Sequence, residues 1–223
     1  MVVWALLDVV LPLSCCGCGH AGVLWCRTCA GALASPRKVD VADLPSVWAA
    51  GIYDGSVRRA IHEWKESGVL ALSSSFAPAL AHAAAMALEH ATAQPPLIFV
   101  PVPSSAAAMR RRGVSPITDL ARQAAQLLTL HGLPTTVDEC LAPARARHDQ
   151  AGLGLEQRAR NMRGSMRLRH SIAGRVIVVD DVVTTGATLR EAVRCLPASA
   201  ELVGGAALAA TVKRHRGSRL SGP

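Results

Sequence analysis

Two adjacent acids followed by a threonine- and glycine-containing turn form the most informative segment of this chain. Asp180 and Asp181 come directly after the aliphatic run at residues 176–179. The turn that follows consists of Thr184, Thr185, Gly186, Ala187 and Thr188. Carboxylates accept hydrogen bonds from vicinal hydroxyls, whereas closely spaced N–H groups at a helix N-terminus bind phosphate. The segment therefore predicts a ribose 5-phosphate site. The alternative is a buried strand before an N-capped helix, although capping alone does not require two acids.

A second turn follows an earlier apolar run. Pro101 and Pro103 prevent the strand at residues 97–102 from continuing, because proline donates no ladder hydrogen bond. Arg112 lies just beyond and is suited to a bidentate contact with a phosphate. The alternative is a proline-rich turn followed by the exposed start of a basic helix.

Residues 150–164 are polar, basic and glycine-bearing, and they precede the strand that leads to the acids. A structureless segment of this length is usually functional or disordered. It is therefore a candidate to close over the ligand, with Arg158, Arg160 and Arg163 as candidate cations. For each of these arginines, an ordinary place in a solvated surface loop is the alternative.

Five of the seven cysteines lie within residues 15–29, and four of these five form two Cys-x-x-Cys pairs separated by seven residues. The predicted metal ligands are Cys15, Cys18, Cys26 and Cys29. Four thiolates at this spacing can surround one Zn²⁺ tetrahedrally and leave no open coordination position, so the predicted zinc is structural. Cys16 is then a spare thiol, and His20 is a substitute ligand. Redox cysteines or an iron–sulfur cluster are the alternatives.

The rest of the chain supplies the elements that would position these groups. A length of 223 residues, with 50% apolar and 18% charged residues, suits an α/β core with a small appendage. Apolar patterns predict strands at residues 47–53, 97–102, 135–141, 175–181 and 202–210. Helical periodicity predicts helices at residues 55–66, 76–92, 117–130 and 188–195. Strands alternating with helices imply an open parallel sheet flanked by helices.

The sequence also suggests how the chain is divided. We expect a zinc module with a linker at residues 1–45, the α/β domain at residues 46–212 and a basic tail at residues 213–223. The apolar stretch at residues 1–14 is shorter than the roughly 20 residues of a membrane span. It also lacks the features of a secretory signal. We therefore expect a cytoplasmic protein without membrane insertion, in line with cysteines that suggest metal binding in a reducing compartment.

Residues 176–188 match the thirteen-residue signature of type I phosphoribosyltransferases. The order of the other motifs resembles that of the ComF family, whose members have a phosphoribosyltransferase-like fold and are in several cases associated with natural competence. The resembling motifs are the cysteine pairs, Tyr53-Asp54-Gly55, Lys65, Pro101-Val102-Pro103, Arg112-Gly113, Gln150, Arg158-Ala159-Arg160-Asn161 and the signature itself. The resemblance extends from about residue 6 to residue 211.

This resemblance implies a site for phosphoribosyl pyrophosphate and Mg²⁺. Asp180 and Asp181 would hold the ribose 2- and 3-hydroxyls, and residues 184–188 would hold the 5-phosphate. The loop after the earlier strand would hold the pyrophosphate, with Val102, Pro103, Ser104, Ser105 and Arg112 as its site residues. Arg158 and Lys65 are candidate catalytic cations. Transfer would then depend on positioned cations, Mg²⁺ and exclusion of water, because ribose gains oxocarbenium character while charge builds on the leaving pyrophosphate.

Two positions qualify this resemblance. Lys65 is either an ammonium that reaches the acids from the preceding helix or an exposed helix charge. After Gly113, the residues Val114-Ser115-Pro116 stand where the family has an aromatic residue followed by Asn-Gln. Acceptor or loop contacts of the family are therefore not carried over to this segment.

Two functions remain open at this point. The first is transfer of phosphoribose to an unidentified nitrogenous acceptor. The second is binding of single-stranded DNA, which a net charge of +8 favours. Proteins that bind single strands usually stack bases on aromatic side chains, and this chain has only seven aromatic residues. DNA binding therefore ranks second. Related folds often dimerise, so the resemblance also suggests a homodimer.

Overall fold

A six-stranded sheet forms the centre of the chain. The structure is a computed structural model that describes residues 13–91, 94, 96–104, 109, 113–144 and 163–212. The strands are β1 (Arg37–Lys38), β2 (Val47–Ile52), β3 (Leu97–Pro101), β4 (Thr135–Val137), β7 (Gly174–Val183) and β8 (Ala200–Ala210). Their order is β1-β2-β8-β7-β3-β4, and every neighbouring pair is parallel except β1 with β2. The predicted open parallel sheet is confirmed, with an antiparallel edge strand added.

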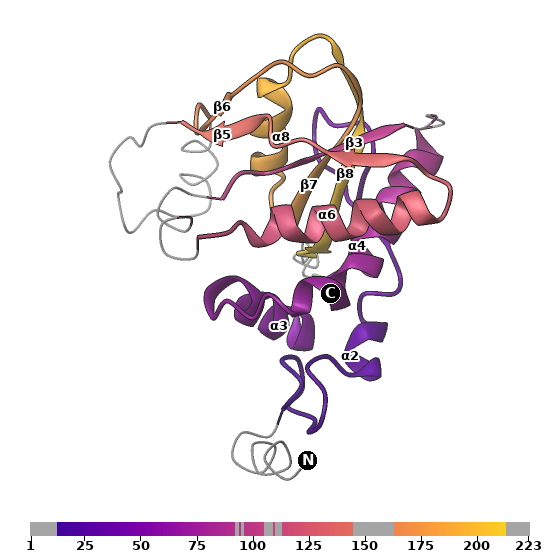
Figure 1. The fold of residues 1–223 in the computed structure, drawn as a ribbon, viewed down its shortest axis with the longest axis vertical. Helices are drawn as coiled ribbons and strands as arrows, with labels where there is room; N and C mark the ends of the chain where they lie inside the picture. Colours follow the sequence, from indigo (N-terminus) through magenta and orange to yellow (C-terminus); the bar gives the residue numbers. More distant parts are fainter. Residues whose placement is uncertain are drawn as a thin grey trace, which may run out of the picture.

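Helices flank the sheet. The flanking helices are α4 (Leu72–His90), α6 (Pro116–Leu130) and α8 (Ala187–Cys195), whereas α2 (Arg27–Gly31) and α3 (Gly55–Glu66) lie towards the lower end of the molecule in Figure 1. The carboxylate of Asp54 accepts the N–H of Gly55 at 2.7 Å where α3 begins. The hydroxyl of Ser115 accepts the N–H of Thr118 at 3.4 Å, and Pro116 occupies the first turn of α6. Among the described residues, no helix combines the length and apolar character needed to cross a membrane.

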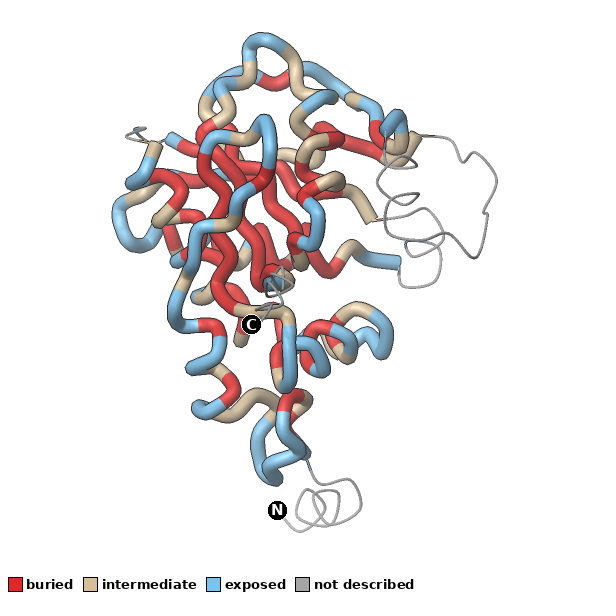
Figure 2. The backbone as a smooth tube through the Cα atoms, turned by 180° about the vertical axis from the view of Figure 1, so that it is seen from behind, coloured by how far each residue is buried: buried red, intermediate tan, exposed pale blue. Residues whose placement is uncertain are grey.

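Alternating side chains of β7 pack on both faces of the sheet. Ile177 and Val179 join a core that includes buried residues of α3, α4 and α6, whereas Val176 and Val178 join a core that includes Leu189 of α8. Figure 2 shows the resulting buried strands in the middle of the molecule. A central strand covered on both faces explains why its sequence is a continuous aliphatic run.

The prediction of one strand at residues 135–141 is wrong. The chain pairs with β3 only along β4 and then enters a separate antiparallel ribbon of two strands. These strands are β5 (Leu141–Pro143) and β6 (Met166–Leu168). Asp138 pairs with His170 at 2.8 Å, and Glu139 pairs with Arg122 at 2.5 Å. Polar side chains with partners outside the sheet therefore interrupt the strand between β4 and β5.

The strand that carries the acids is longer than predicted. β7 continues past Asp181 because Val182 and Val183 still pair with Ala209 and Ala210 of β8. Asp180 itself lies opposite Ala207. The acids therefore occupy the last part of a hydrogen-bonded strand, where the ladder fixes their backbone.

Part of the segment expected to be a linker contacts the sheet. β1 pairs with the edge of β2, and Val41 is buried against the start of α8. The sequence contains no sustained apolar pattern at residues 34–45, so neither contact was predicted. The cysteine-rich segment lies beyond this point, at the lower end of the molecule in Figure 1.

The topology contains a switch point between β3 and β7. From β3 the chain passes through α6 to β4 on one side, whereas from β7 it passes through α8 to β8 on the other side. In open α/β sheets, ligands bind in the crevice at the carboxyl ends of the strands where the order reverses. The fold therefore brings the ends of β3 and β7 together at the edge where a ligand is expected.

We predict that Gly51→Ala destabilises the protein by about 1–3 kcal/mol, because a new methyl group in a packed interior forces its neighbours to move. A Cβ at Gly51 would lie 2.3 Å from the carbonyl oxygen of Ala32. Gly31→Ala is the matched control, since a Cβ there meets nothing within 4 Å. Urea unfolding measures both free energies, and equal stability of the two variants would contradict this packing.

Candidate functional site

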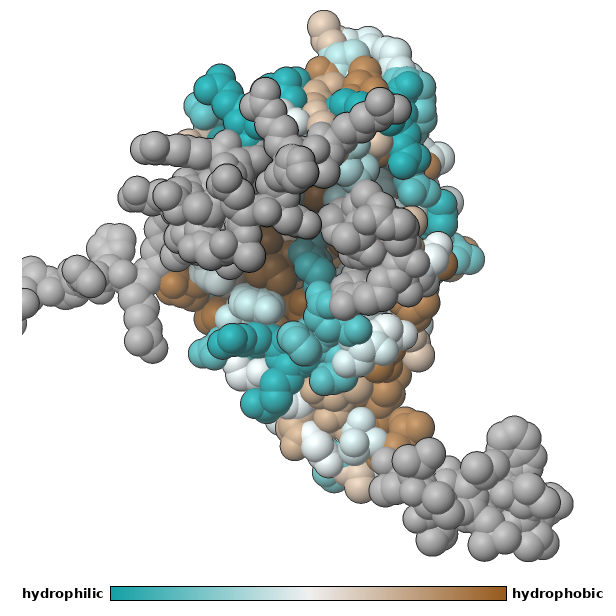
Figure 3. Space-filling model, turned by 90° about the vertical axis from the view of Figure 1, so that its left-hand side faces the viewer, coloured by the Kyte–Doolittle hydropathy of each residue, from teal (hydrophilic) through white to brown (hydrophobic). Residues whose placement is uncertain are grey.

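A cleft of about 490 Å³ opens at the carboxyl ends of β3 and β7. Its walls come from the end of β2, from α3, from the loop after β3, from the start of α6, and from β7 with its following turn. The lining residues are Tyr53, Ile61, Trp64, Lys65, Glu66, Val102, Pro103, Ser104, Pro116, Ile117, Asp180, Asp181, Val182, Thr184 and Thr188. One cavity therefore combines acids, a cation, hydroxyls and an apolar wall. On the face shown in Figure 3, hydrophilic residues likewise lie directly beside hydrophobic ones.

Most of the residues that the sequence selected for a ligand meet in this cleft. The cleft is lined by Lys65, Val102, Pro103, Ser104, Asp180, Asp181, Thr184 and Thr188. Thr185, Gly186 and Ala187 belong to the same turn but do not line it, and Ala187 faces a second cavity. Ser105, Arg112 and Arg158 lie outside the described residues, so their predicted roles stay predictions.

The two acids are buried side by side. Asp180 and Asp181 are each 8% exposed. The N–H of Asp181 donates to Oδ1 of Asp180 at 2.8 Å, and the N–H of Val182 donates to Oδ1 of Asp181 at 2.7 Å. Burial raises the pKa of the Asp180 carboxyl well above its ordinary value, and the neighbouring charge of Asp181 raises it further. This pair therefore stabilises bound hydroxyl donors or positive charge.

Lys65 supplies positive charge to this pair. Its ammonium forms an ion pair with the carboxylate of Asp181. Burial by itself would lower the pKa of Lys65, but the charge of Asp181, the hydrogen bond to it and the charge of Asp180 raise that pKa above its ordinary value. Lys65 is therefore protonated at neutral pH. Of the two interpretations of this residue, the structure favours the ammonium that reaches the acids.

The position of Lys65 follows from the helix that carries it. Ile61 and Trp64 of α3 are 1% and 0% exposed, and they fix the helix against the core. The indole N–H of Trp64 also donates to the hydroxyl of Ser73 in α4 at 3.0 Å. The next residue along α3 is Lys65, whose side chain is 40% exposed and so lies at the rim of the cleft.

The turn after β7 requires glycine at its centre. Gly186 has φ +73°, which favours glycine, and a Cβ there would lie 2.3 Å from Cγ1 of Val41. Thr184 and Thr185 on the preceding side are exposed. The N–H of Ala187 contacts Oγ1 of Thr185 at 3.4 Å at the first turn of α8. Hydroxyls and a helix N-terminus thus meet at the edge of the cleft, as an anion site requires.

The loop after β3 differs in detail from what the sequence suggested. The N–H of Val102 donates to the carbonyl of Val179 at 2.9 Å, so it extends the sheet. Pro103 has no N–H. Backbone donors for an anion in this loop therefore begin at Ser104, whose hydroxyl lies 3.2 Å from that of Ser115. Val102 and Pro103 line the cleft without offering a free donor.

Several lining residues were not selected from the sequence. Tyr53, Pro116 and Ile117 form part of the wall, and Glu66 adds a third carboxylate. Tyr53 is the only tyrosine of the chain and stands in the Tyr-Asp-Gly motif, which was a usable signal. Pro116 and Ile117 looked only like the start of a helix, because nothing local shows which end of α6 faces the cleft.

Arg163 is not brought to this cleft. It lines a separate cavity of about 510 Å³ together with Asp43, Arg190 and Arg194. In that cavity Arg194 is engaged by the buried carboxylate of Glu191 at 2.8 Å. The prediction that Arg163 is a cation over the ligand therefore finds no support in its position.

The predicted zinc ligands form one cluster. The Sγ atoms of Cys15, Cys18, Cys26 and Cys29 all lie within 4.8 Å of one another, and the Cys18–Cys26 pair is 3.6 Å apart. Tetrahedral Zn–S bonds of about 2.3 Å place thiolate sulfurs ~3.8 Å apart, so these residues fit a zinc ion. Such an ion would be held by all four thiolates and would fix the two Cys-x-x-Cys pairs to each other.

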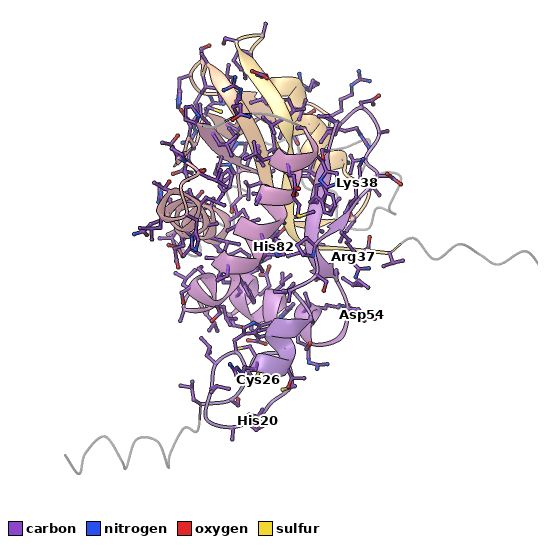
Figure 4. The ribbon with its side chains drawn as sticks, turned by 90° about the vertical axis from the view of Figure 1, so that its right-hand side faces the viewer. His20, Cys26, Arg37, Lys38, Asp54 and His82 are labelled. Atoms are coloured by element: carbon purple, nitrogen blue, oxygen red, sulfur yellow. The ribbon has the colours of Figure 1, made fainter. Side chains whose placement is uncertain are left out.

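The thiols differ in acidity. Burial would raise the pKa of Cys15, but hydrogen bonds from the backbone of Cys26, Cys18 and Gly17 lower it to about 6. Burial raises the pKa of Cys29 to about 12. Within the described part of the chain, neither Cys16 nor His20 belongs to the cluster. Figure 4 shows His20 and Cys26 together at the lower end of the molecule.

The cysteine cluster is attached to the helix that lines the cleft. Nε of Arg59 in α3 donates to the carbonyl of Gly17 at 2.6 Å. Trp25 packs edge-on against Phe76 with ring centroids 5.4 Å apart, and Phe76 packs in the same way against Trp64 at 5.8 Å. Aromatic contacts therefore connect the cysteine cluster to a residue of the cleft wall.

We predict that Cys26→Ser abolishes zinc binding and lowers the Tm by several degrees, because a structural zinc contributes folding free energy. Cys16→Ser is the matched control and should keep one zinc per chain. Elemental analysis of the purified proteins and thermal unfolding measure both effects. Equal metal content in the two variants would contradict the four-thiolate site.

We predict that Asp180→Asn stabilises the ligand-free protein. The folded-state pKa of Asp180 is raised above its ordinary value of 3.8, so its contribution to stability falls as pH rises above that value. At about pH 8 the variant should have a higher Tm than the wild type, and the difference should shrink towards pH 4. Asp40→Asn, at an exposed position, should give no such gain. If Asp180→Asn is less stable than the wild type at every pH, then the ionised Asp180 carboxylate does not destabilise the folded protein.

Comparison with protein families relates this site to known proteins. The sequence matches the phosphoribosyl transferase domain over residues 74–219. A comparison with curated proteins gives no match. The matched residues form more than half of the chain and include β3, α6, β7, α8 and β8. The chain therefore belongs to the phosphoribosyl transferase domain family.

Proposed function

We propose that this protein binds phosphoribosyl pyrophosphate with Mg²⁺ and transfers its phosphoribose to a nitrogenous acceptor. One observation carries the proposal. A buried acid pair and a threonine turn at a helix N-terminus open into the same cleft, at the switch point of the sheet. A ribose phosphate satisfies both parts, because its hydroxyls donate to carboxylates and its phosphate accepts from N–H and hydroxyl groups. Membership of the phosphoribosyl transferase family supports this assignment.

Each wall of the cleft has a part in this proposal. Asp180 and Asp181 accept from the ribose hydroxyls, and residues 184–188 bind the 5-phosphate. The loop from Ser104 onward binds the pyrophosphate. Mg²⁺ bound with the donor neutralises charge on the pyrophosphate as it leaves. The apolar wall near Tyr53 and Ile117 excludes water and faces the acceptor.

The finer family assignment is also a proposal. We infer a ComF-type protein of the cytoplasm, with a zinc module and linker at residues 1–45, the transferase domain at residues 46–212 and a basic tail beyond. The cysteine cluster beside a phosphoribosyl transferase domain supports this. Thiolate ligands are stable in a reducing compartment, which is consistent with that location.

Single-stranded DNA binding is the second candidate, supported by the net charge of +8. Basic side chains such as Arg37 and Lys38 lie on the edge strand β1, near the right-hand side in Figure 4. However, each described aromatic side chain is buried or half-buried, so the described surface offers no exposed aromatic platform for bases. The transferase function therefore has the stronger support.

We predict that the double variant Asp180→Asn/Asp181→Asn loses at least about 100-fold in affinity for phosphoribosyl pyrophosphate with Mg²⁺, because two charge-assisted hydrogen bonds to hydroxyls are removed. Isothermal titration calorimetry measures this affinity. Asp40→Asn removes one exposed carboxylate away from the cleft, is the control for the loss of a surface carboxylate, and should bind as the wild type does.

Two results would contradict the proposed function. The first is a wild-type protein that does not bind the donor. The second is DNA affinity that falls steeply with salt and is unchanged by the double substitution, since that dependence indicates contacts to phosphates of a nucleic acid. A panel of nitrogenous bases, scored for donor-dependent release of pyrophosphate, then identifies the acceptor.

A further inference from the structure

We propose that Lys65 is the residue by which this site distinguishes phosphoribosyl pyrophosphate from ribose 5-phosphate. The inference rests on the proposed function and adds a specificity-determining role for one side chain. Its starting point is the ion pair between Lys65 and Asp181, which lies inside the cleft. In the ligand-free protein, a carboxylate assigned to the ribose hydroxyls is thus already occupied.

A ribose that binds to the acids has to displace this ammonium from Asp181. Hydroxyl groups replace the hydrogen bonds that Asp181 accepts, but they bring no negative charge for Lys65. The displaced ammonium then lies beside Asp180 and Glu66, the other carboxylates that raise its pKa. Asp180 is itself buried and engaged by the N–H of Asp181 at 2.8 Å. A ligand without a further anionic group therefore leaves Lys65 without an equivalent partner.

The pyrophosphate of the donor supplies that partner. It is attached to ribose C1, which is bonded to C2, and the acids hold the hydroxyls on C2 and C3. The pyrophosphate must therefore lie within a few ångströms of the acid pair, on the side of one of those hydroxyls. Lys65 already reaches Asp181, so a small rotation of its side chain brings the ammonium to a phosphate oxygen.

The helix allows this rotation without moving the backbone. The neighbouring residue Trp64 is fully buried and Ile61 is 1% exposed, so α3 holds the Cα atom of Lys65 in place. The Lys65 side chain is 40% exposed at the rim of the cleft, and its flexible four-carbon stem can turn in that space. Lys65 therefore acts as an exchangeable counter-ion, which binds Asp181 in the ligand-free state and pyrophosphate in the complex.

This exchange of partners by Lys65 gives the site different affinities for the two ligands. Ribose 5-phosphate breaks an ion pair and offers no replacement, whereas phosphoribosyl pyrophosphate breaks the same pair and forms a new one. Lys65 therefore weakens the binding of ribose 5-phosphate and strengthens the binding of phosphoribosyl pyrophosphate. Lys65 therefore contributes to selectivity in both directions, which a residue with only a structural role would not do.

The test compares the affinities of both ligands, measured by calorimetry at the same pH and Mg²⁺ concentration. Lys65→Met removes the ammonium and keeps most of the apolar stem. We expect its Kd for phosphoribosyl pyrophosphate to rise by about tenfold or more and its Kd for ribose 5-phosphate to stay unchanged or to fall. The preference for the donor should therefore fall at least about tenfold.

Three further variants make the result specific. Lys65→Gln repeats the loss of charge with a polar side chain and is measured in the same way, so that a failure of Lys65→Met to fold does not decide the outcome. Lys65→Arg restores a cation and should recover most of the preference. Lys38→Met is the matched control on the exposed edge strand and should change neither affinity.

Some results would overturn the inference while leaving the proposed function intact. If the wild type binds the donor and both neutral variants weaken the two ligands by the same factor, Lys65 only supports the fold of the site. An unchanged preference for the donor would likewise exclude a role in selectivity. A wild type that binds neither ligand overturns the proposed function and this inference with it.

Discussion

Two buried carboxylates that share one nearby ammonium determine the character of this site. Asp180 and Asp181 are adjacent in the sequence, are held by the β7 ladder and are almost fully excluded from water, so they cannot move apart to reduce their repulsion. The ion pair with Lys65 compensates only one of them directly. Such an arrangement costs stability in the ligand-free protein, and functional sites commonly accept such a cost. A ligand that donates hydrogen bonds to these oxygens relieves it.

The rest of the fold places the other polar groups of the cleft near these acids. The switch in strand order places the loop after β3 beside the turn after β7, although more than seventy residues separate them in the sequence. α3 lines the same cleft, and its position depends on Trp64, on α4 and on the cysteine cluster below it. The cysteine cluster is thus attached to the wall of the cleft through α3 and α4, although none of its four cysteines lines the cleft.

The sequence predicted those features that depend on neighbouring residues. The strand, acids and turn from Val176 to Thr188 are contiguous, so the kind of ligand that they suit could be predicted, and the four cysteines had the spacing of a metal site. Contacts between residues far apart in the sequence could not be predicted. Nothing local indicated that Ile117 would line the same cleft as Lys65, that Val41 would pack on Gly186, or that the N–H of Val102 would be used by the sheet. The single strand expected at residues 135–141 failed because polar residues with distant partners divide it.

The contact between Val41 and Gly186 bears on how this protein can be divided into fragments. The segment that matches the phosphoribosyl transferase domain begins at residue 74, inside α4, whereas β2, α3 and Val41 all precede it. A fragment limited to the matched segment would lack two strands of the sheet, β1 and β2, as well as Lys65 of the cleft and the Val41 side chain that packs against Gly186. The smallest autonomous folding unit therefore starts well before the recognisable domain.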